Sequence, residues 1–376
     1  MSAQRRSGIA LAAAIYAVAI ASVIVTGVLF TIVRSRRATD GGMRDRQLVA
    51  AAEEALFGAL ERWDGAARAR QAVGATSAWR VDLPGAPLLA DSVHVTRLDE
   101  TVYWIVADAA FAGDPRLRIT APSRRRLSLL VRVPPVRLPL SAALVAAGDV
   151  ALGVDARIDA NAGDATCGGA DSAAVLPGGA QLLLDPLYPP GAPSVRHDSL
   201  AADPRTYDML GGESWQALAD RADVQLPPDA RVTPLPTLGD GACASAVNNW
   251  GDPRRVTPPG PCESRAPLVH AAGDLTIDGG SGQGVLLVDG RLHLGGPLLY
   301  AGLVIARGGI DTFTDGPTIS GMVLSASGAL AGQGVPPSVL LAHRITIRYS
   351  RCDVQHGIAS TRQARPVRSR AWTETF

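Results

Sequence analysis

Carboxylates and imidazoles recur in the second half of the chain, where a short apolar motif repeats. Aspartates at equal positions of stacked repeats would suit calcium binding or acid–base cleavage of polysaccharides. Counted from each repeat start, the aspartates fall at offsets 6, 10, 4, 8 and 12 for Asp274, Asp278, Asp289, Asp311 and Asp315. The histidines fall at offsets 2, 8 and 4 for His270, His293 and His343. Neither residue type forms a column, so we predict no metal site and no catalytic carboxylate pair.

Two further segments contain residue types that are used in catalysis or in nucleotide binding. The glycine-rich run 279–284 lacks the Lys-Ser/Thr ending and the following helix of a phosphate-binding loop, and a turn between repeats explains it better. His197, Asp198 and Ser199 are adjacent, but a catalytic triad is assembled by geometry rather than by adjacency. The sequence therefore predicts a non-enzymatic protein without a cofactor.

The four cysteines are Cys167, Cys243, Cys262 and Cys352. None belongs to a C-x-x-C pair, which disfavours zinc and thioredoxin-like chemistry. An even number of cysteines in an exported domain favours two disulfides, for which three connectivities are possible. The pairing Cys243–Cys262 is preferred because it closes a short proline-rich loop, and Cys167 and Cys352 would then form the second bond.

Composition limits the classes of protein that remain. The 376 residues carry a net charge of +1, so no strong electrostatic field points to nucleic acid as a partner. With 40 glycines, 27 prolines and 5% aromatic residues, the chain is rich in turns and small side chains. Repetitive β structure has this composition, and 47% apolar content is enough to build a core.

The N-terminal 37 residues predict a membrane anchor. A short basic leader, residues 1–8, precedes an uncharged apolar run over residues 9–33, which as a helix would extend about 37 Å. That exceeds the roughly 30 Å of a hydrocarbon core and is too long for a cleaved secretory signal. A plain signal anchor remains an alternative. Thr39–Gly42 should break the helix, and a second, amphipathic helix is expected over residues 43–71.

The leader resembles the class III leader of type IV pilin-like proteins, because the basic stretch Arg5-Arg6-Ser7-Gly8 directly precedes the apolar helix. The resemblance implies cleavage after Gly8 by prepilin peptidase, with Ile9 as the mature N-terminus. The stretch 44–56 is similar to the "DRQ…AAEAAL" segment of PilX-type minor pilins. Most pilins carry Glu five residues into the mature chain, whereas this chain has Ala13. That difference favours a minor or tip-type subunit over a bulk filament subunit.

The resemblance also bears on orientation, since it places the N-terminus in the cytoplasm and the body outside. The arginines of residues 34–46 favour the opposite orientation by the positive-inside rule. The pilin-like leader and the cysteines lead us to expect the body in the periplasm or at the cell surface, with the helix in the inner membrane.

The residues after the second helix predict an α+β layout. Alternating apolar positions indicate strands at 93–98, 101–106, 116–120 and 126–133, within a small antiparallel sheet over residues 76–136.

An internal repeat follows the predicted sheet. Copies begin at residues 143, 268, 285 and 303, with degenerate copies at 322 and 339. Units this short must stack on one another, so residues 141–350 are predicted to form a short parallel β-helix, with an irregular glycine-rich sandwich as the alternative.

Two segments accompany the predicted β-helix. A disulfide-tied insertion at about 161–266 would lie on its flank, with one short helix near 214–222. The basic tail, residues 351–376, is either a flexible strand or a cap for the last turn. The glycine-punctuated repeats look like the β-helical C-terminal part of larger PilX-like proteins.

We therefore expect a membrane-anchored minor pilin-like subunit that serves in assembly or at the tip of a type IV pilus or a type II secretion-like system. Its partners would be the membrane, other pilin-like subunits and the assembly machinery, and surface glycans or cell contacts. An uncleaved, signal-anchored envelope protein with a β-solenoid adhesion module is the main alternative. A β-helical carbohydrate-active enzyme is the third.

Overall fold

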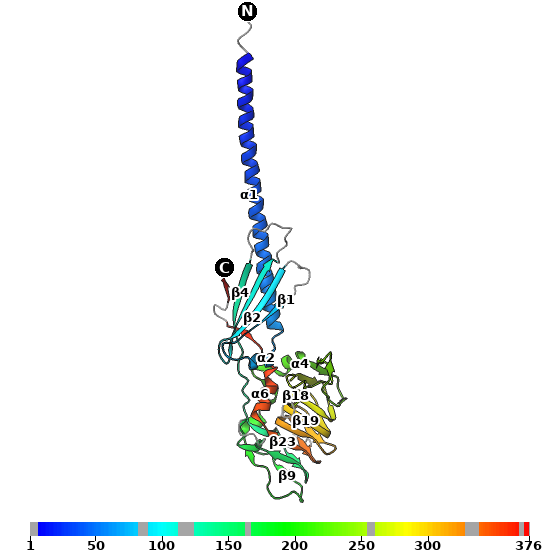
Figure 1. Cartoon of the computed structure of the whole chain (residues 1–376). Helices are drawn as coiled ribbons and strands as arrows, with labels where there is room; N and C mark the ends of the chain where they lie inside the picture. The colour runs from blue at the N-terminus through cyan, green and yellow to red at the C-terminus, as the bar shows by residue number, and fades with distance from the viewer. Residues whose placement is uncertain are drawn as a thin grey trace, which may run out of the picture.

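The protein consists of a long helix, an antiparallel sheet and a parallel β-solenoid, arranged one after another (Figure 1). The computed structural model describes residues 7–81, 89–111, 124–161, 167–253, 260–327, 338–367 and 372–375. The chain leaves the sheet after β4, forms the solenoid and returns to the sheet, so the C-terminus lies beside β4 (Figure 1). The architecture is thus α+β followed by parallel β, as the sequence predicts.

Helix α1 runs without interruption over Ser7–Glu61. The predicted break at Thr39–Gly42 is wrong, because the helix continues through it. Two glycines cost only about 2 kcal/mol in a helix, and strong helix formers extend the helix on both sides. The expected second helix is therefore the last part of α1 together with a short α2, Gly65–Arg70, which Asp64 caps by accepting a hydrogen bond from the Ala67 N–H at 2.8 Å.

The C-terminal part of α1 packs on the antiparallel sheet. The strands are β1 Thr76–Val81, β2 Leu89–Arg97, β3 Val102–Phe111 and β4 Arg124–Arg132, paired in that order. Leu48 and Leu56 on the helix and Ile105 and Leu129 on the sheet are fully buried in one shared core. The sequence did not single out β1 as a strand, and the expected strand at 116–120 lies outside the described residues.

The C-terminal tail completes the sheet. After helix α6, Arg351–Ala359, the strands β24 Arg365–Pro366 and β25 Trp372–Thr375 pair antiparallel with β4. The tail therefore covers the edge of β4, which would otherwise present unpaired backbone groups. Of the two expectations for the tail, a strand or a cap for the last turn of the solenoid, the structure shows strands, and they pair with the antiparallel sheet.

The solenoid has three parallel sides. The first side stacks β13 Val224–Leu226, β17 Leu268–Ala271, β18 Leu275–Val288, β19 Leu292–Ala306, β21 Thr318–Ser325, β5 Ala142–Ala146, β8 Ser172–Leu176 and β10 Val195–His197. The second side stacks β14 Ala230–Val232, the starts of β18 and β19, β20 Ile310–Thr312, β22 Val339–Leu341, β6 Val150–Leu152 and β9 Leu182–Leu184. The third side includes β23 Thr346–Tyr349 and β7 Arg157–Asp159. The inward side chains of all three sides form the main core.

The order of turns in space differs from their order in the chain. The turn that begins with β5 stacks on the turn that begins with the second half of β21, through the parallel pairs β21–β5, β22–β6 and β23–β7. We call this junction the seam. The turns from β13 to β23 form one block and those from β5 to β10 form the other, so the solenoid is circularly permuted.

A disulfide crosses the seam region. Cys167 follows β7, Cys352 follows β23, and the two residues are bonded. The second disulfide joins Cys243 to Cys262. One bond thus ties the two blocks of the solenoid together, and the other closes a local loop.

The predicted insertion, residues 161–266, lies only partly on the flank, because much of it belongs to the solenoid itself. It contributes β8, β9 and β10 at one end of the stack and β13 and β14 at the other. The repeat at 339 is also not a separate turn, because β22 pairs with β20 and is the second side of the turn that begins at 322. Permutation explains the first correction, since the insertion must connect opposite ends of the stack.

The connection between the two ends forms a strap, residues 198–223, over the outside of the first side. It contains η1 Ser199–Ala202, α3 Arg205–Asp208, β11 Met209–Leu210, β12 Glu213–Ser214 and α4 Trp215–Asp220, and α4 lies in the expected helix near 214–222. Tyr207, Trp215 and Leu218 pack on the outward apolar side chains of the first side, and α6 adds Val354 and Ile358. The first side is therefore buried on both faces.

A glycine column forms one corner of the solenoid. Gly302 pairs in register with Gly284 and Gly321, and its φ is +140°. A Cβ on Gly302 would lie 2.0 Å from the carbonyl oxygen of Gly284. The corner therefore requires glycine, and Gly357 of α6 packs directly against it.

Candidate functional site

The N-terminal part of α1 is apolar, and its described side chains over Ala14–Ile32 are exposed. Over Ala14–Ile32, 19 residues have a mean hydropathy of 2.4, and none is buried. Among the described residues, this is the helix that is long and apolar enough to cross a membrane. Ile15, Tyr16, Val23 and Phe30 are all more than 60% exposed. At about 1.5 Å per residue the segment extends about 28 Å, close to the thickness of a hydrocarbon core.

The serine and threonine hydroxyls of this segment donate hydrogen bonds within the helix. Thr26 Oγ1 donates to the Ser22 carbonyl at 2.7 Å, and Thr31 Oγ1 donates to the Gly27 carbonyl at 2.8 Å. Ser22 does the same with Val18. A polar group left unpaired in hydrocarbon would cost several kcal/mol, roughly. The segment Ala14–Ile32 of α1 therefore suits an apolar environment.

The two halves of α1 differ in what they pack against. The half near the sheet buries Leu48 and Leu56 within the protein, whereas none of the side chains of Ala14–Ile32 is buried. The expected cleavage junction Gly8–Ile9 lies in the first turn of α1. The basic residue Arg34, just beyond the apolar segment, is exposed.

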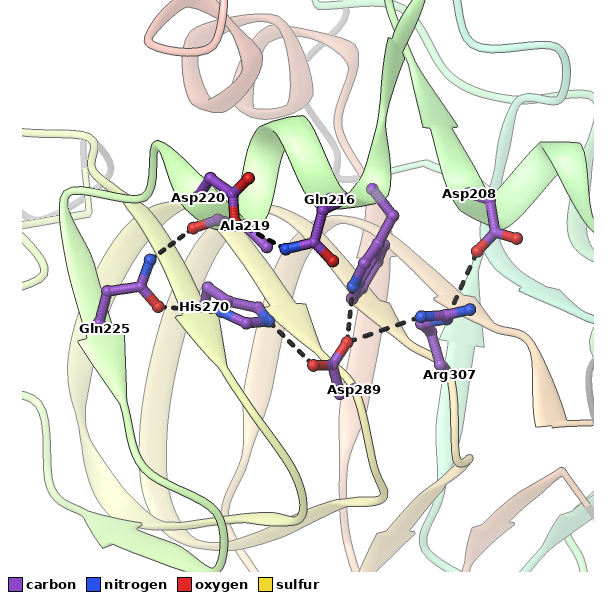
Figure 2. Close-up of polar contacts among 9 residues, drawn as sticks. Asp208, Gln216, Ala219, Asp220, Gln225, His270, Asp289 and Arg307 are labelled. Carbon is purple, nitrogen blue, oxygen red and sulfur yellow. Dashed lines mark hydrogen bonds and ion pairs between the residues drawn. The ribbon is translucent and has the colours of Figure 1, made fainter.

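The candidate polar residues of the repeats form pairs across neighbouring turns. His270 Nε2 lies 3.1 Å from Asp289 Oδ2, and its Nδ1 lies 3.0 Å from Gln225 Oε1. Asp289 also accepts a hydrogen bond from Trp215 Nε1 at 2.6 Å and lies 3.7 Å from Arg307 (Figure 2). The network joins four turns of the solenoid, those of Gln225, His270, Asp289 and Arg307, to the strap.

The composition of this network indicates a structural role. Trp215 belongs to the strap, while Asp289 and Arg307 follow β18 and β19, so the carboxylate holds the strap against the side it covers. The guanidinium of Arg307 lies 5.1 Å from the Trp215 ring and 3.4 Å from Asp208 of the strap. We call these contacts the strap clasp.

Pairs between unlike residues do not show when aspartates are compared only with aspartates and histidines only with histidines. His293 and Asp311 share offset 8, and they are register partners whose side chains lie 2.7 Å apart. Asp289 and Arg307 share offset 4. Comparing residues of opposite charge at equal offsets would have found both pairs.

The remaining candidates do not come together as a catalytic site. Residues 279–284 lie within strand β18 of the solenoid. They form neither a separate turn between repeats nor a loop that leads into a helix. His197 ends β10, where its Nδ1 lies 3.0 Å from the Pro177 carbonyl oxygen, and Asp198 caps η1 by accepting from the Leu200 N–H. Within the described ranges, no three His, Cys, Asp or Glu residues are grouped as metal ligands.

Comparisons with known proteins add little. No protein-family model and no curated protein matches the chain. Among solved structures, the chain is similar to the competence-associated pilin ComZ from Thermus thermophilus, at 12% identity and a TM-score of 0.24, over 88% of this chain and 96% of that one. A TM-score this low does not establish a shared fold, so the case for a function rests on the chain's own residues.

Proposed function

We propose that the protein is a membrane-anchored, non-enzymatic pilin-like subunit that acts in assembly or at the tip of a type IV pilus or a type II secretion-like system. The observation that carries the proposal is α1, whose N-terminal half is exposed and apolar while its C-terminal half packs on an antiparallel sheet. One continuous helix of this kind can sit in the bilayer and then pack among the helices of other subunits.

The leader supports the cleaved form of this proposal. The basic residues Arg5 and Arg6 precede Gly8, and Ile9 begins the apolar run. Cleavage after Gly8 would leave Ile9 as the first residue of the mature helix. Ala13, at the position where most pilins carry Glu, supports a minor or tip-type role.

The solenoid would be the part that the anchor displays. It lies at the far end of the molecule from the N-terminus of α1, beyond the sheet (Figure 1). Its two disulfides suit an oxidising compartment, which supports a periplasmic or surface location. The rival proposal is an uncleaved envelope protein in which the same solenoid serves as an adhesion or scaffold module.

N-terminal sequencing separates the two proposals. The protein is purified from membranes of cells with and without prepilin peptidase. We expect Ile9 as the first residue in normal cells and an intact leader in cells without the peptidase. An intact leader in normal cells, or an Ile9 start that persists without the peptidase, would contradict the pilin-like proposal.

A further inference from the structure

A cavity of about 590 Å³ lies where the C-terminal end of α1, helix α2, the tail after α6 and the solenoid meet. Its walls come from the end of α1 and from α2, from the turn after α6, and from the strap and solenoid at residues 221–223 and 264–268. Cys243 of the local disulfide also lines it. Pockets that bind small molecules have volumes of about 300–1,000 Å³ and commonly form where domains meet. The cavity thus has the size and position of a ligand site.

The lining is rich in arginine. Arg62, Arg70, Arg221, Arg265 and Arg362 face the cavity. No ion pair joins any of these five guanidinium groups to a carboxylate in the part of the chain that the structure describes. Three acidic residues also line the cavity, so the formal charge of the lining is five positive minus three negative, or +2.

Two of the three acidic residues are already occupied by backbone N–H groups. Asp64 accepts from Ala67, and Asp223 accepts from Leu268, each at 2.8 Å. These hydrogen bonds fix both carboxylates on the backbone. Asp223, together with Glu213, acts on Arg221 and offsets part of the positive charge, so the lining keeps a formal excess of +2.

Two hydrogen-bond donors in the lining are shielded from solvent and lack a partner. They are Nε1 of Trp63 and Nε of Arg362. A buried donor without a partner is unfavourable, most of all when it carries charge, and native proteins rarely keep one without a reason. A ligand's acceptor atom would satisfy either donor once the side chains that cover it move aside.

The electrostatic setting favours an anion. Burial is the main cause that lowers the pKa of Arg221 and of Arg362. Glu213 and Asp223 oppose the shift of Arg221 while Arg365 adds to it, and Tyr103 opposes the shift of Arg362 while Arg97 adds to it. Arg221 is held in place by donating to the Thr361 carbonyl at 2.9 Å, and Arg265 by donating to the Asn249 carbonyl at 2.9 Å. Fixed, partly desolvated guanidinium groups bind oxyanions well because their N–H groups match the oxygen geometry.

We propose that this cavity binds a small molecule through a phosphate, sulfate or carboxylate group, which Arg221, Arg362 and the Trp63 N–H contact. The volume exceeds that of a bare oxyanion, so the group would be the head of a larger ligand. The cavity is separate from the apolar segment Ala14–Ile32 of α1, and the proposal does not depend on whether the leader is cleaved.

Titration of the full chain in detergent micelles tests the proposal. Potassium phosphate, sodium sulfate and sodium citrate are added at constant ionic strength, with sodium chloride as the reference. We expect at least one oxyanion to bind with saturation and to raise the unfolding temperature above the chloride reference. The comparison of phosphate and sulfate with citrate identifies the preferred head group. Equal behaviour of all salts at equal ionic strength would overturn the proposal.

Variants locate the site. The double variant Arg221→Gln/Arg362→Gln should weaken oxyanion binding at least tenfold, and Trp63→Phe, which keeps an aromatic ring but loses the donor, should weaken it severalfold. Arg205→Gln is the matched control, because Arg205 is exposed on α3 and does not line the cavity. Binding by the folded double variant within twofold of the unaltered protein would overturn the proposal. Should that variant not fold, Trp63→Phe and the titration of the unaltered chain still decide.

Discussion

Cys167 and Cys352 are 185 residues apart in the sequence, yet their Cα atoms lie 5.1 Å apart beside the seam of the solenoid. Their bond follows the β7–β23 pair, which joins the first turn formed in the chain to the last. The segments of the solenoid that are farthest apart in the sequence are therefore in contact, and this disulfide links them covalently.

Removing the seam disulfide should destabilise the protein more than removing the local one. In the chain-entropy description, closing a 185-residue loop contributes about 5 kcal/mol and a 19-residue loop about 3 kcal/mol. We expect Cys167→Ser/Cys352→Ser to lose about 2 kcal/mol more than Cys243→Ser/Cys262→Ser in denaturant unfolding. An equal or smaller loss for the seam pair would show that the seam holds without it.

Gly302→Ala should destabilise the solenoid by about 3 kcal/mol, since its φ is +140° and a Cβ would lie 2.0 Å from the Gly284 oxygen. The matched control is Gly178→Ala, where a Cβ meets no atom within 4 Å, and its effect should be within about 0.5 kcal/mol. The measurement is the free energy of unfolding. Similar values for both variants would argue against the glycine corner.

Asp289→Ala should loosen the strap, because it leaves Trp215 Nε1 and His270 Nε2 without their acceptor. We expect a loss of about 2 kcal/mol and faster hydrogen exchange of the α4 amides. Asp278→Ala, which removes an exposed ion pair with Arg231, should lose about 0.5 kcal/mol and leave α4 exchange unchanged. Unchanged α4 protection in Asp289→Ala would contradict the clasp.

Asp108 should make the antiparallel sheet sensitive to acid. Burial opposes ionisation, but hydrogen bonds from Arg126 at 2.7 Å and Arg124 at 3.2 Å outweigh it and lower the pKa of Asp108 below its ordinary value of 3.8. A lowered pKa in the folded state stabilises the fold above that ordinary value, and the contribution is lost as the pH falls through the folded pKa.

The variant Asp108→Asn tests this sign. At pH 7 we expect the unaltered protein to be more stable by about 2 kcal/mol, and the difference should shrink as the pH falls below about 4. Unfolding in urea at several pH values measures it. A difference that stays constant with pH would show that ionisation of Asp108 is not coupled to folding.

Much of the fold could be read from local patterns. The apolar run, the alternation in β2, β3 and β4 and the spacing of the repeats at 268, 285, 303 and 322 each reflect a period that one element imposes on its own residues. The same periods place Leu56 and Ile105 on the apolar faces of their own elements. Local patterns do not say which elements become neighbours, and there the sequence was less informative.

The permuted order of turns shows this limit. The segment 143–150 matches 268–275 most closely in sequence, but it stacks on 322–325 in space. Any turn can stack on any other because all bury the same kinds of side chain, and the insertion of residues 161–266 is long enough to reach either end. The seam and the strap clasp depend on that choice, so neither could be predicted.

The first residue of the mature chain tests the central proposal most directly. The measurement is mass spectrometry of the N-terminal peptide of the unaltered protein, of Gly8→Arg and of the neighbouring control Ser7→Ala, all purified from membranes of cells that contain prepilin peptidase. We predict an Ile9 start for the unaltered protein and the control, and a retained leader for Gly8→Arg. A retained leader in the unaltered protein, or an Ile9 start in Gly8→Arg, would contradict the proposal that this is a processed pilin-like subunit.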